Sequence, residues 1–542
     1  MQNSADRKAK EDSYTGSFSK KIDDLIGVFS PQRKFDRMRA RWGINYAFSN
    51  FHGSERTRLR TKWVPSSGSA DDVLLGELST LRERCRDLNR NDSVAKGITD
   101  TIVNNVVGSG IVPQSTINYK ILGISKQKAI DWENRIEDVW RKWEEHADIT
   151  GLLNFCETQK LYYRQKLDNG DSIALPRMLK RMESPYEFAL EIIEADRLST
   201  PYGLKGNGYL REGVEIDDWG RPITYYIQTN HPGSSIYKKS VKQDWIPISA
   251  YSELGQKNVY HYFDVLRAGQ NRGIPLFVAA ILAFQDLGSY IEAELVAKRI
   301  AACYGIFFRK KDPWNASRNL KNDTNSASQR ITEFEPGMVG YLGEGEEVFD
   351  FKPNRPGEQF RDFVELMHRI VGTSANLPYE LVLKDFSKTN YSSARAALLE
   401  ARRYFKVEQK SLIRKYCQPT YERVIDEAYL KDELDIPDYW KGRYYWTKSR
   451  WITPGWQWVD PKKEIEAAIL AIKNNLSTYS DEAASQGREW ETVFEQKHRE
   501  LEKKRELGLP EEQEKSPAQR FVDSIKESII DEVLEIVRNG KE

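Results

Sequence analysis

The stretch that decides the fold runs from Leu377 to Tyr429: LPYELVLKDFSKTN at 377–390, followed by YSSARAALLEARRYFKVEQKSLIRKYCQPTYERVIDEAY at 391–429. In its second part, apolar residues recur at the three- and four-residue spacing of one helical face. They are Ala394, Ala397, Leu398, Ala401, Phe405, Leu412, Ile413 and Tyr416. The spacing predicts a long amphipathic helix over 392–430.

Both the start and the outer face of this helix can be predicted. Asn390, Ser392 or Ser393 can cap the start, because a side-chain oxygen there accepts hydrogen bonds from unpaired backbone amides. The face opposite the apolar stripe is expected to be exposed and carries charged residues, namely Arg395, Glu400, Arg402, Arg403, Lys406, Glu408 and Lys410.

A polar loop precedes the helix, with Phe386 as its aromatic residue. Periodicity alone predicts a packed helix with an ordinary surface loop. The sequence TNYSSARAALLE at 389–400, however, resembles the corresponding segment of the portal proteins of lambda-type tailed bacteriophages. In that family the loop projects into the central channel of a ring, and the helix holds the loop in the wing of each subunit.

Three other segments resemble the same family and follow in the family's order. They are LNRNDSVAKG with VNNVVGSGI at 88–97 and 103–111, RAGQNRGIP at 267–275, and WQWVDPKKE at 456–464. The resemblance covers about residues 80–490. Four separate matches in order are more specific than any one of them.

The charge of the chain limits how it can meet DNA. The 542 residues suffice for three or four domains, and 82 Lys and Arg stand against 81 Asp and Glu. A protein that grips DNA tightly normally has a strong basic excess, because phosphate neutralisation supplies most of the affinity. This surface is therefore expected to tolerate DNA or to ignore it.

Cysteine usage and catalytic motifs argue against several function classes. Cys85, Cys156, Cys303 and Cys417 are scattered without a CxxC pair, which favours reduced thiols over a zinc site or disulfides. The sequence contains no GxxxxGK[ST], HExxH or GxSxG motif. We expect no enzyme activity and no cofactor. A metal-dependent DNA-processing enzyme, such as a nuclease, stays open as the alternative, because its acidic ligands can lie far apart.

The N-terminal segment and the most apolar run each admit a simple interpretation. Basic residues between Arg33 and Arg41 could form a nucleic-acid arm, but they alternate with residues that can pack, which favours a solvated peripheral segment. The apolar run from Ile274 to Phe284 is too short to cross a bilayer, so no membrane association is expected.

The secondary structure expected elsewhere combines helices and strands. Helices are predicted at about 71–107 (broken near Asn89–Asp92), 126–147, 152–167, 358–372 and 520–537, and at 275–303 with Pro275 in the first helical position. Strands are predicted at 172–178, 188–193, 258–263, 305–310 and 338–342, and a hairpin joins 212–216 to 223–227.

The resemblance implies an α+β portal fold that assembles into a ring. Its parts would be an N-terminal polar and basic segment (1–70), wing (71–272), stem helix (273–303), clip (304–356), second stem helix (357–375), channel loop (376–391), long wing helix (392–430), and crown with C-terminal helices (431–542).

The resemblance also implies a function and its partners. About twelve copies would form a ring at the capsid vertex through which double-stranded DNA is packaged and ejected. The expected partners are the terminase large subunit, the major capsid and scaffold proteins, and the head–tail connector proteins. The protein would be assembled in the host cytoplasm and reside in the virion.

The resemblance places the candidate site residues in two groups. The DNA-facing channel loop would comprise Leu383, Lys384, Asp385, Phe386, Ser387 and Lys388. The channel-lining face of the second stem helix would comprise Arg361, Glu365, His368 and Arg369.

Overall fold

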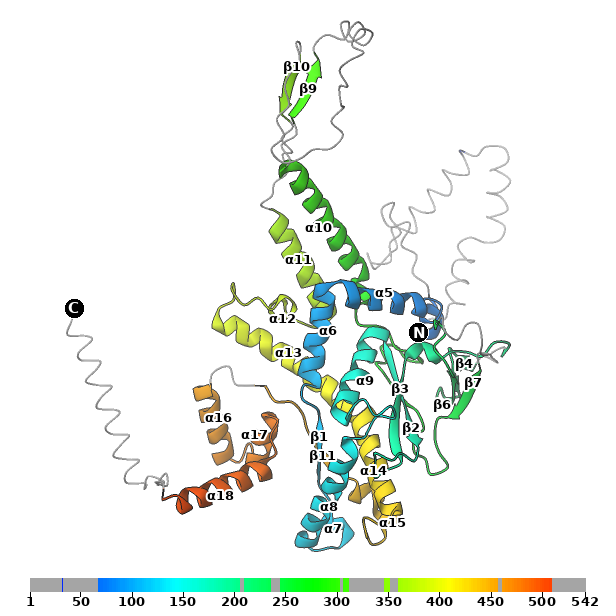
Figure 1. Ribbon diagram of the computed structural model, residues 1–542, viewed down its shortest axis with the longest axis vertical. Coiled ribbons are helices and arrows are strands. Elements are labelled where there is room, and N and C mark those ends of the chain that lie inside the picture. The colour runs from blue at the N-terminus through cyan, green and yellow to red at the C-terminus, as the bar shows by residue number, and fades with distance from the viewer. Residues whose placement is uncertain are drawn as a thin grey trace, which may run out of the picture. The chain divides into compact units, whose positions relative to one another are not determined.

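The computed structural model describes residues 67–204, 209–234, 244–302, 306–310, 346–350, 359–456 and 461–508, together with Gln32 (Figure 1). The chain divides into two units, Met1–Gly68 and Ser69–Glu542. The elements below belong to the second unit.

Three helices open this unit. They are α4 (Ala70–Leu74), α5 (Leu78–Asn91) and α6 (Ser93–Val106). The predicted break near Asn89–Asp92 is confirmed, because Asp92 has an extended backbone between α5 and α6. Its carboxylate accepts hydrogen bonds from the amides of Val94 and Ala95, at 2.8 and 2.9 Å, and so caps α6.

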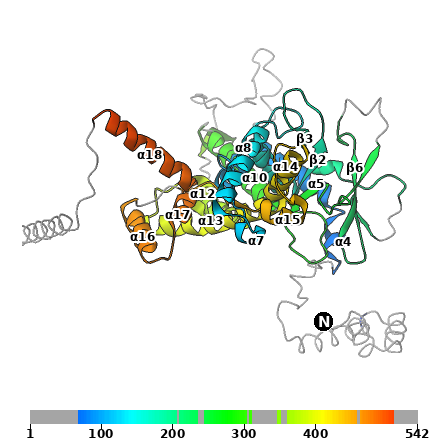
Figure 2. The ribbon, with the colours of Figure 1, turned by 90° about the horizontal axis from the view of Figure 1, so that it is seen from below.

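An aromatic core fills the space between the next helices. Helix α8 (Lys126–Glu144) lies beside α14 (Gln418–Leu430) in both views (Figure 1, Figure 2). Trp143 of α8 stacks on Phe188, and Phe155 of α9 (Phe155–Asn169) stacks on Tyr416, with ring centroids 5.4 and 5.7 Å apart. All four rings are buried, so segments far apart in sequence share one core.

Two antiparallel sheets carry most of the strands. In the first, β2 (Asp171–Met178) lies between β3 (Phe188–Ile193) and β8 (Tyr260–Phe263). The second has the order β4 (Leu210–Arg211), β5 (Val214–Ile216), β6 (Pro222–Gln228) and β7 (Trp245–Ser249). The predicted hairpin is confirmed by the β5–β6 pair, with Val214 opposite Tyr225.

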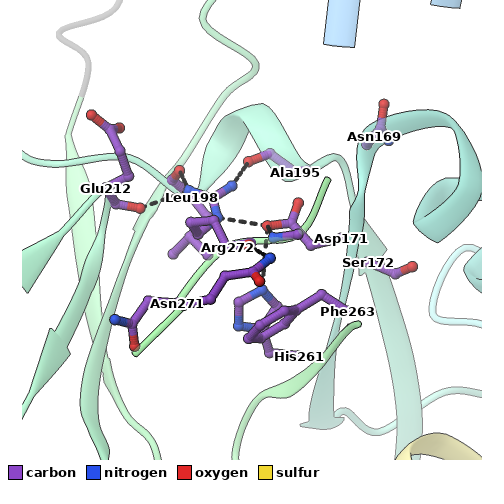
Figure 3. Close-up of polar contacts among 12 residues, drawn as sticks. Asn169, Asp171, Ser172, Ala195, Leu198, Glu212, His261, Phe263, Asn271 and Arg272 are labelled. Atoms are coloured by element: carbon purple, nitrogen blue, oxygen red, sulfur yellow. Dashed lines mark hydrogen bonds and ion pairs between the residues drawn. The ribbon is translucent and has the colours of Figure 1, made fainter. Parts of the chain in front are cut away.

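A buried ion cluster ties the first sheet to the segment before the stem (Figure 3). The Asp171 carboxylate lies 2.6 Å from Nε of Arg272 and 3.0 Å from Nη2 of Arg82. The Arg272 guanidinium also donates to the carbonyls of Ala195, Leu198 and Glu212. Burial opposes ionisation of Asp171, but the two arginines outweigh it and hold the pKa of that carboxyl well below its usual range.

The first stem helix begins later than predicted. A 3₁₀ turn (η4, Val278–Ala280) precedes α10 (Ile281–Ala302), so Pro275 is not in the first helical position. The reason is a close contact upstream: a Cβ at Gly273 would lie 1.9 Å from the carbonyl oxygen of Gly170. The amide of Leu276 donates a hydrogen bond to the carbonyl oxygen of Leu167. The backbone at this point therefore does not form a helix that begins at Pro275.

The helix predicted at 358–372 lies close to its observed bounds, whereas the helix predicted at 392–430 is divided after Leu412. The observed helices are α11 (Gln359–Ser374), which packs beside α10, and α13 (Tyr391–Leu412). A π-helical turn (Ile413–Cys417) joins α13 to α14. Strand β9 (Ile306–Lys310) pairs with β10 (Glu346–Asp350), whereas the strand predicted at 338–342 lies outside the described residues.

After α14, the described residues form a short strand and further helices. Strand β11 (Ser449–Ile452) pairs with β1 (Val112–Ser115), next to α7 (Tyr119–Leu122) and α15 (Tyr439–Trp446). Helices α16 (Pro461–Lys473), α17 (Tyr479–Ser485) and α18 (Trp490–Glu506) follow, and none of their residues is buried. The helix predicted at 520–537 lies outside the described residues.

Among the helices in the described ranges, none combines the length and the apolar character that a membrane crossing requires.

Candidate functional site

The site begins at a corner between α11 and the short helix α12 (Tyr379–Leu383). Asn376 has a φ of 55°, and the amide of Leu377 donates to the carbonyl of Gly372 at 2.9 Å. This pattern satisfies the last carbonyls of α11. A Cβ at Gly372 would lie 2.8 Å from both the Leu377 carbonyl oxygen and Val382, so the corner needs glycine there.

The predicted channel loop is shorter than expected at its start. Leu383 is the last residue of α12, and Lys384 turns the chain with a φ of 57°. Asp385 Oδ1 accepts a hydrogen bond from the amide of Ser387 at 2.9 Å. The Ser387 hydroxyl and amide hold the pKa of the Asp385 carboxyl below its usual range. The loop therefore has a defined local turn.

The end of the loop is fixed by the cap of α13. Of the three capping residues considered, Asn390 is the one used, and its side chain accepts from the amide of Ser393 at 2.8 Å. Thr389 Oγ1 donates to Glu380 of α12 at 3.2 Å. Phe386 is 41% exposed, so its ring is not enclosed within the chain.

The loop and the second stem helix meet at one carboxylate. Lys388 Nζ lies 2.5 Å from Oε1 of Glu365, and Arg361 Nε lies 3.0 Å from the same oxygen. Arg369 approaches the other oxygen at 3.7 Å, and its guanidinium also lies over the Tyr379 ring. The Lys388 ammonium, followed by Arg361, holds the pKa of Glu365 below its usual range.

His368 differs from the other three predicted residues of this helix face. It is buried, and burial lowers its pKa. Phe363, Leu366 and Ile370 are each at least 40% exposed on the same helix. A side chain enclosed by its own chain is not available to a channel, so we exclude His368 from the candidate site.

Glu408 was predicted on the exposed face of the wing helix, and this prediction is wrong. The residue is buried, and its carboxylate lies 2.5 Å from Nζ of Lys166 and accepts from the hydroxyl of Tyr163 at 2.9 Å. The physical reason is its position, since it lies three residues after Phe405 and four before Leu412, on the buried face. That spacing is a sequence signal that could have identified it.

One group of described residues has the composition of a metal site: Glu194, Asp196 and His231. Several of its polar atoms already have partners. Arg86 forms an ion pair with Asp196, and His231 Nδ1 accepts from the amide of Gly233 at 3.0 Å. With Nδ1 accepting, a neutral His231 carries its proton on Nε2, which lies 3.0 Å from Glu194. We therefore interpret the group as a hydrogen-bonded surface cluster.

Comparison with known proteins identifies the family. The family described as phage portal protein, lambda family, matches residues 56–409, more than half of the chain. The chain therefore belongs to the lambda family of phage portal proteins. This family is structural rather than enzymatic, and portal proteins are virion components at the junction of head and tail.

Individual relatives agree with this assignment. The probable portal protein of Halomonas phage phiHAP-1 is 27% identical and covers 85% of this chain and 88% of its own length. Portal protein B of Escherichia phage lambda is 22% identical, covering 85% of this chain and 91% of its own length. The portal protein of Escherichia phage N15 is 24% identical, with coverages of 82% and 88%.

Among solved structures, a chain from the virion of a native gene transfer agent particle aligns with a TM-score of 0.40. It is 13% identical and covers 77% of this chain and 95% of its own length. That likeness is too low to carry a conclusion about assembly.

Proposed function

We propose that about twelve copies of this chain form a ring at the capsid vertex, through which double-stranded DNA enters and leaves the head. The observation that carries the proposal is the apolar surface of the stem helices. On α10, Leu282, Leu295 and Val296 are between 45% and 67% exposed. On α11, Phe363, Leu366 and Ile370 are between 40% and 52% exposed.

Such a surface favours contact with another protein. Soluble monomers seldom expose many large apolar side chains on one pair of packed helices. A head-to-tail contact between unlike faces of adjacent copies covers both helices and closes a ring when the rotation allows it. The family membership supports a ring rather than an open chain of subunits.

In this ring, residues 384–388 face the DNA, and Arg361, Glu365 and Arg369 line the channel beside them. The contacts are weak one by one, because a lysine–phosphate pair is well hydrated, but the ring repeats them around one duplex. The near-balance of 82 basic and 81 acidic residues also fits a channel along which DNA slides. Lys388 already forms an ion pair with Glu365, and this pairing weakens the attraction between its ammonium group and a DNA phosphate.

The remaining roles follow from the family. We propose that the clip (304–356) meets the terminase large subunit during packaging and the head–tail connector proteins afterwards. The wing and crown would meet the capsid and scaffold proteins during assembly in the host cytoplasm. The protein itself would act without catalysis or cofactor.

Native mass measurement of the purified protein tests the ring. We expect one high-mass species of about twelve subunits for the parent and mainly monomers for the double variant Leu282→Asp/Leu366→Asp. The matched control is Leu254→Asp, which changes a 75% exposed leucine outside the stem and should leave the ring intact. A well-folded parent monomer at micromolar concentration and physiological salt contradicts the proposal.

A further inference from the structure

A groove outside the proposed channel lies between α13 and the C-terminal helices. It is lined by Arg395, Leu399 and Arg402 of α13, Glu464, Ala467, Ala468 and Ala471 of α16, and Glu482 of α17. Its floor is mostly alanine and leucine, and charged side chains stand at its edges. Arg395 lies 3.8 Å from Glu464, so one ion pair already bridges the two walls.

The helices on one side of this groove have no apolar core of their own. No residue of α16, α17 or α18 is buried, and Ile469, Leu470 and Leu476 are 47%, 62% and 83% exposed. Polar contacts link this segment to earlier parts of the chain. Arg450 pairs with Asp481 at 2.9 Å, and Gln114 donates to Glu489 at 3.2 Å. Since short helices owe their stability to packing, this segment needs further apolar cover.

The lining of the groove is balanced in charge, with two arginines and two glutamates, whereas the exposed part of α13 beyond the lining is basic. Along α13 the exposed side chains are mainly basic, with Arg403 81% exposed, Lys406 and Lys410 also exposed, and Glu400 the acidic exception. An amphipathic helix with acidic flanks would place its apolar stripe on the alanine floor and its carboxylates near these cations.

The chain supplies such a segment at residues 520–537. Its apolar residues recur every four positions, as Phe521, Ile525, Ile529, Val533 and Val537. The segment has five acidic residues against two basic ones, the acidic ones being Asp523, Glu527, Asp531, Glu532 and Glu535. Its apolar stripe matches the alanine and leucine residues that line the groove, and its net negative charge complements the exposed basic residues of α13.

The intervening chain is long enough for the segment to return to the groove. Helix α18 has 17 residues and is therefore about 25 Å long. It starts close to α17, which lines the groove, since the rings of Tyr479 and Phe494 lie 5.9 Å apart. The 13 residues from 507 to 519 span up to about 45 Å when extended. Residues 507–519 can therefore span more than the length of α18, so the segment that follows them can return to the groove.

We propose that residues 520–537 form an amphipathic helix that docks in the α13–α16 groove of the same chain. Docking would complete the packing of α16–α18 and link the C-terminal helices to the long wing helix. The assignment stands independently of the ring, because it concerns contacts within one chain.

Hydrogen exchange of the full-length protein tests the docking. The variant Ile525→Asp/Ile529→Asp should raise the exchange rate of amides in 464–471 and in the α13 segment facing them by at least about tenfold, because lost packing lowers the local opening free energy. The matched control Ser524→Asp/Ser528→Asp adds the same charges beside the apolar stripe and should leave exchange unchanged. Equal exchange in the parent and the apolar variant overturns the proposal.

A cysteine cross-link tests the location. The pair Ala468→Cys with Ile529→Cys should give a disulfide under mild oxidation, whereas either single variant should not. Protein assembled from a mixture of ¹⁴N-labelled and ¹⁵N-labelled chains then distinguishes docking within one chain from docking onto a second copy. Cross-linked peptides of one isotope support docking within a chain, and mixed-isotope pairs show that a second copy is the occupant and overturn the assignment.

Discussion

Lys388 of the proposed channel loop and Glu365 of α11 form an ion pair, with Nζ 2.5 Å from Oε1. The sequence resemblance assigned the two residues to different segments, a DNA-facing loop and a channel-lining helix, and placed both segments at the same channel. Arg361 and Arg369 lie one turn before and one turn after Glu365, so three cations share one carboxylate. The pair therefore connects the proposed DNA-facing loop to the proposed channel wall within one subunit.

The loop can be tested by removing its charges. We expect the triple variant Lys384→Ser/Asp385→Ser/Lys388→Ser to assemble normally, with a Tm within about 2 °C of the parent, because exposed side chains contribute little stability. DNA packaging or retention should nevertheless fall, as measured by the amount of full-length DNA in filled particles. The control Lys126→Ser/Lys128→Ser/Asp131→Ser removes the same charges from exposed positions on α8. Full packaging by the loop variant would show that another element faces the DNA.

The elements found from sequence were those with a local signal. Helix α13 has a regular apolar stripe and an asparagine cap, so its start was predicted at 392, one residue after the observed start at Tyr391. The loop was predictable because polar residues separate two apolar segments. Such signals depend only on neighbours within a few turns of chain.

The features that were missed depend on partners far away in sequence. Arg272 and Asp171 are 101 residues apart, and Glu408 is 242 residues from Lys166. The local spacing places Glu408 on the buried face of α13, but no local pattern indicates that it will meet Lys166 there or that Asp171 will meet Arg272. His368 was misplaced for the same reason, because its burial depends on which neighbouring segment covers α11.

The buried Lys166–Glu408 pair gives a prediction about stability. Glu408→Ala takes from the buried Lys166 ammonium one of its two carboxylate partners, and the half-exposed Asp264 remains at 2.7 Å. Breaking a buried pair costs about 3–5 kcal/mol, so with Asp264 still present we expect a loss near the lower end of that range. Urea denaturation followed by tryptophan fluorescence should show the loss. Glu400→Ala is the control, since that carboxylate is 74% exposed on the same helix and should change stability by less than about 0.5 kcal/mol. Equal midpoints for Glu408→Ala and the parent would contradict the structural role.

Because Gly170 and Gly273 are in close contact, we expect that position 273, before α10, tolerates no side chain larger than that of glycine. Gly273→Ala places a Cβ 1.9 Å from a backbone oxygen, so β2 and the segment leading to α10 must separate, and soluble expression should fall sharply. Gly288→Ala is the control, because a Cβ there meets nothing within 4 Å and the residue lies inside α10. It should stabilise the chain by about 0.5–1 kcal/mol, since alanine favours helix more than glycine does. Normal expression of Gly273→Ala would show that this corner can relax.

The last prediction concerns pH and the contact between α8 and the start of α18. The pKa of the Glu137 carboxyl is raised to about 7, chiefly by burial and in smaller part by the nearby carboxylates of Glu489 and Glu491. Two contacts oppose this rise: the amide of Ser115 donates to Glu137 Oε1 at 2.9 Å, and Arg141 lies 3.6 Å from its other oxygen. The folded state thus prefers the protonated acid more strongly than the unfolded chain does.

The sign of the pH effect follows from that preference. The stabilisation from protonated Glu137 is full below the unfolded pKa, about 4.3, and is lost as pH rises through about 7. Glu137→Gln keeps an acceptor for the Ser115 amide and cannot ionise. Because Glu137 retains some contact with solvent, we expect the variant to exceed the parent in stability at pH 8 by only about 1 kcal/mol. The difference near pH 5 should be much smaller, because most of the loss falls between pH 5 and pH 8. Urea denaturation at both pH values measures this, and Glu145→Gln, at an exposed position of the same region, should show no such pH-dependent gain. A gain of equal size at pH 5 and pH 8 would assign the effect to packing rather than to ionisation of Glu137.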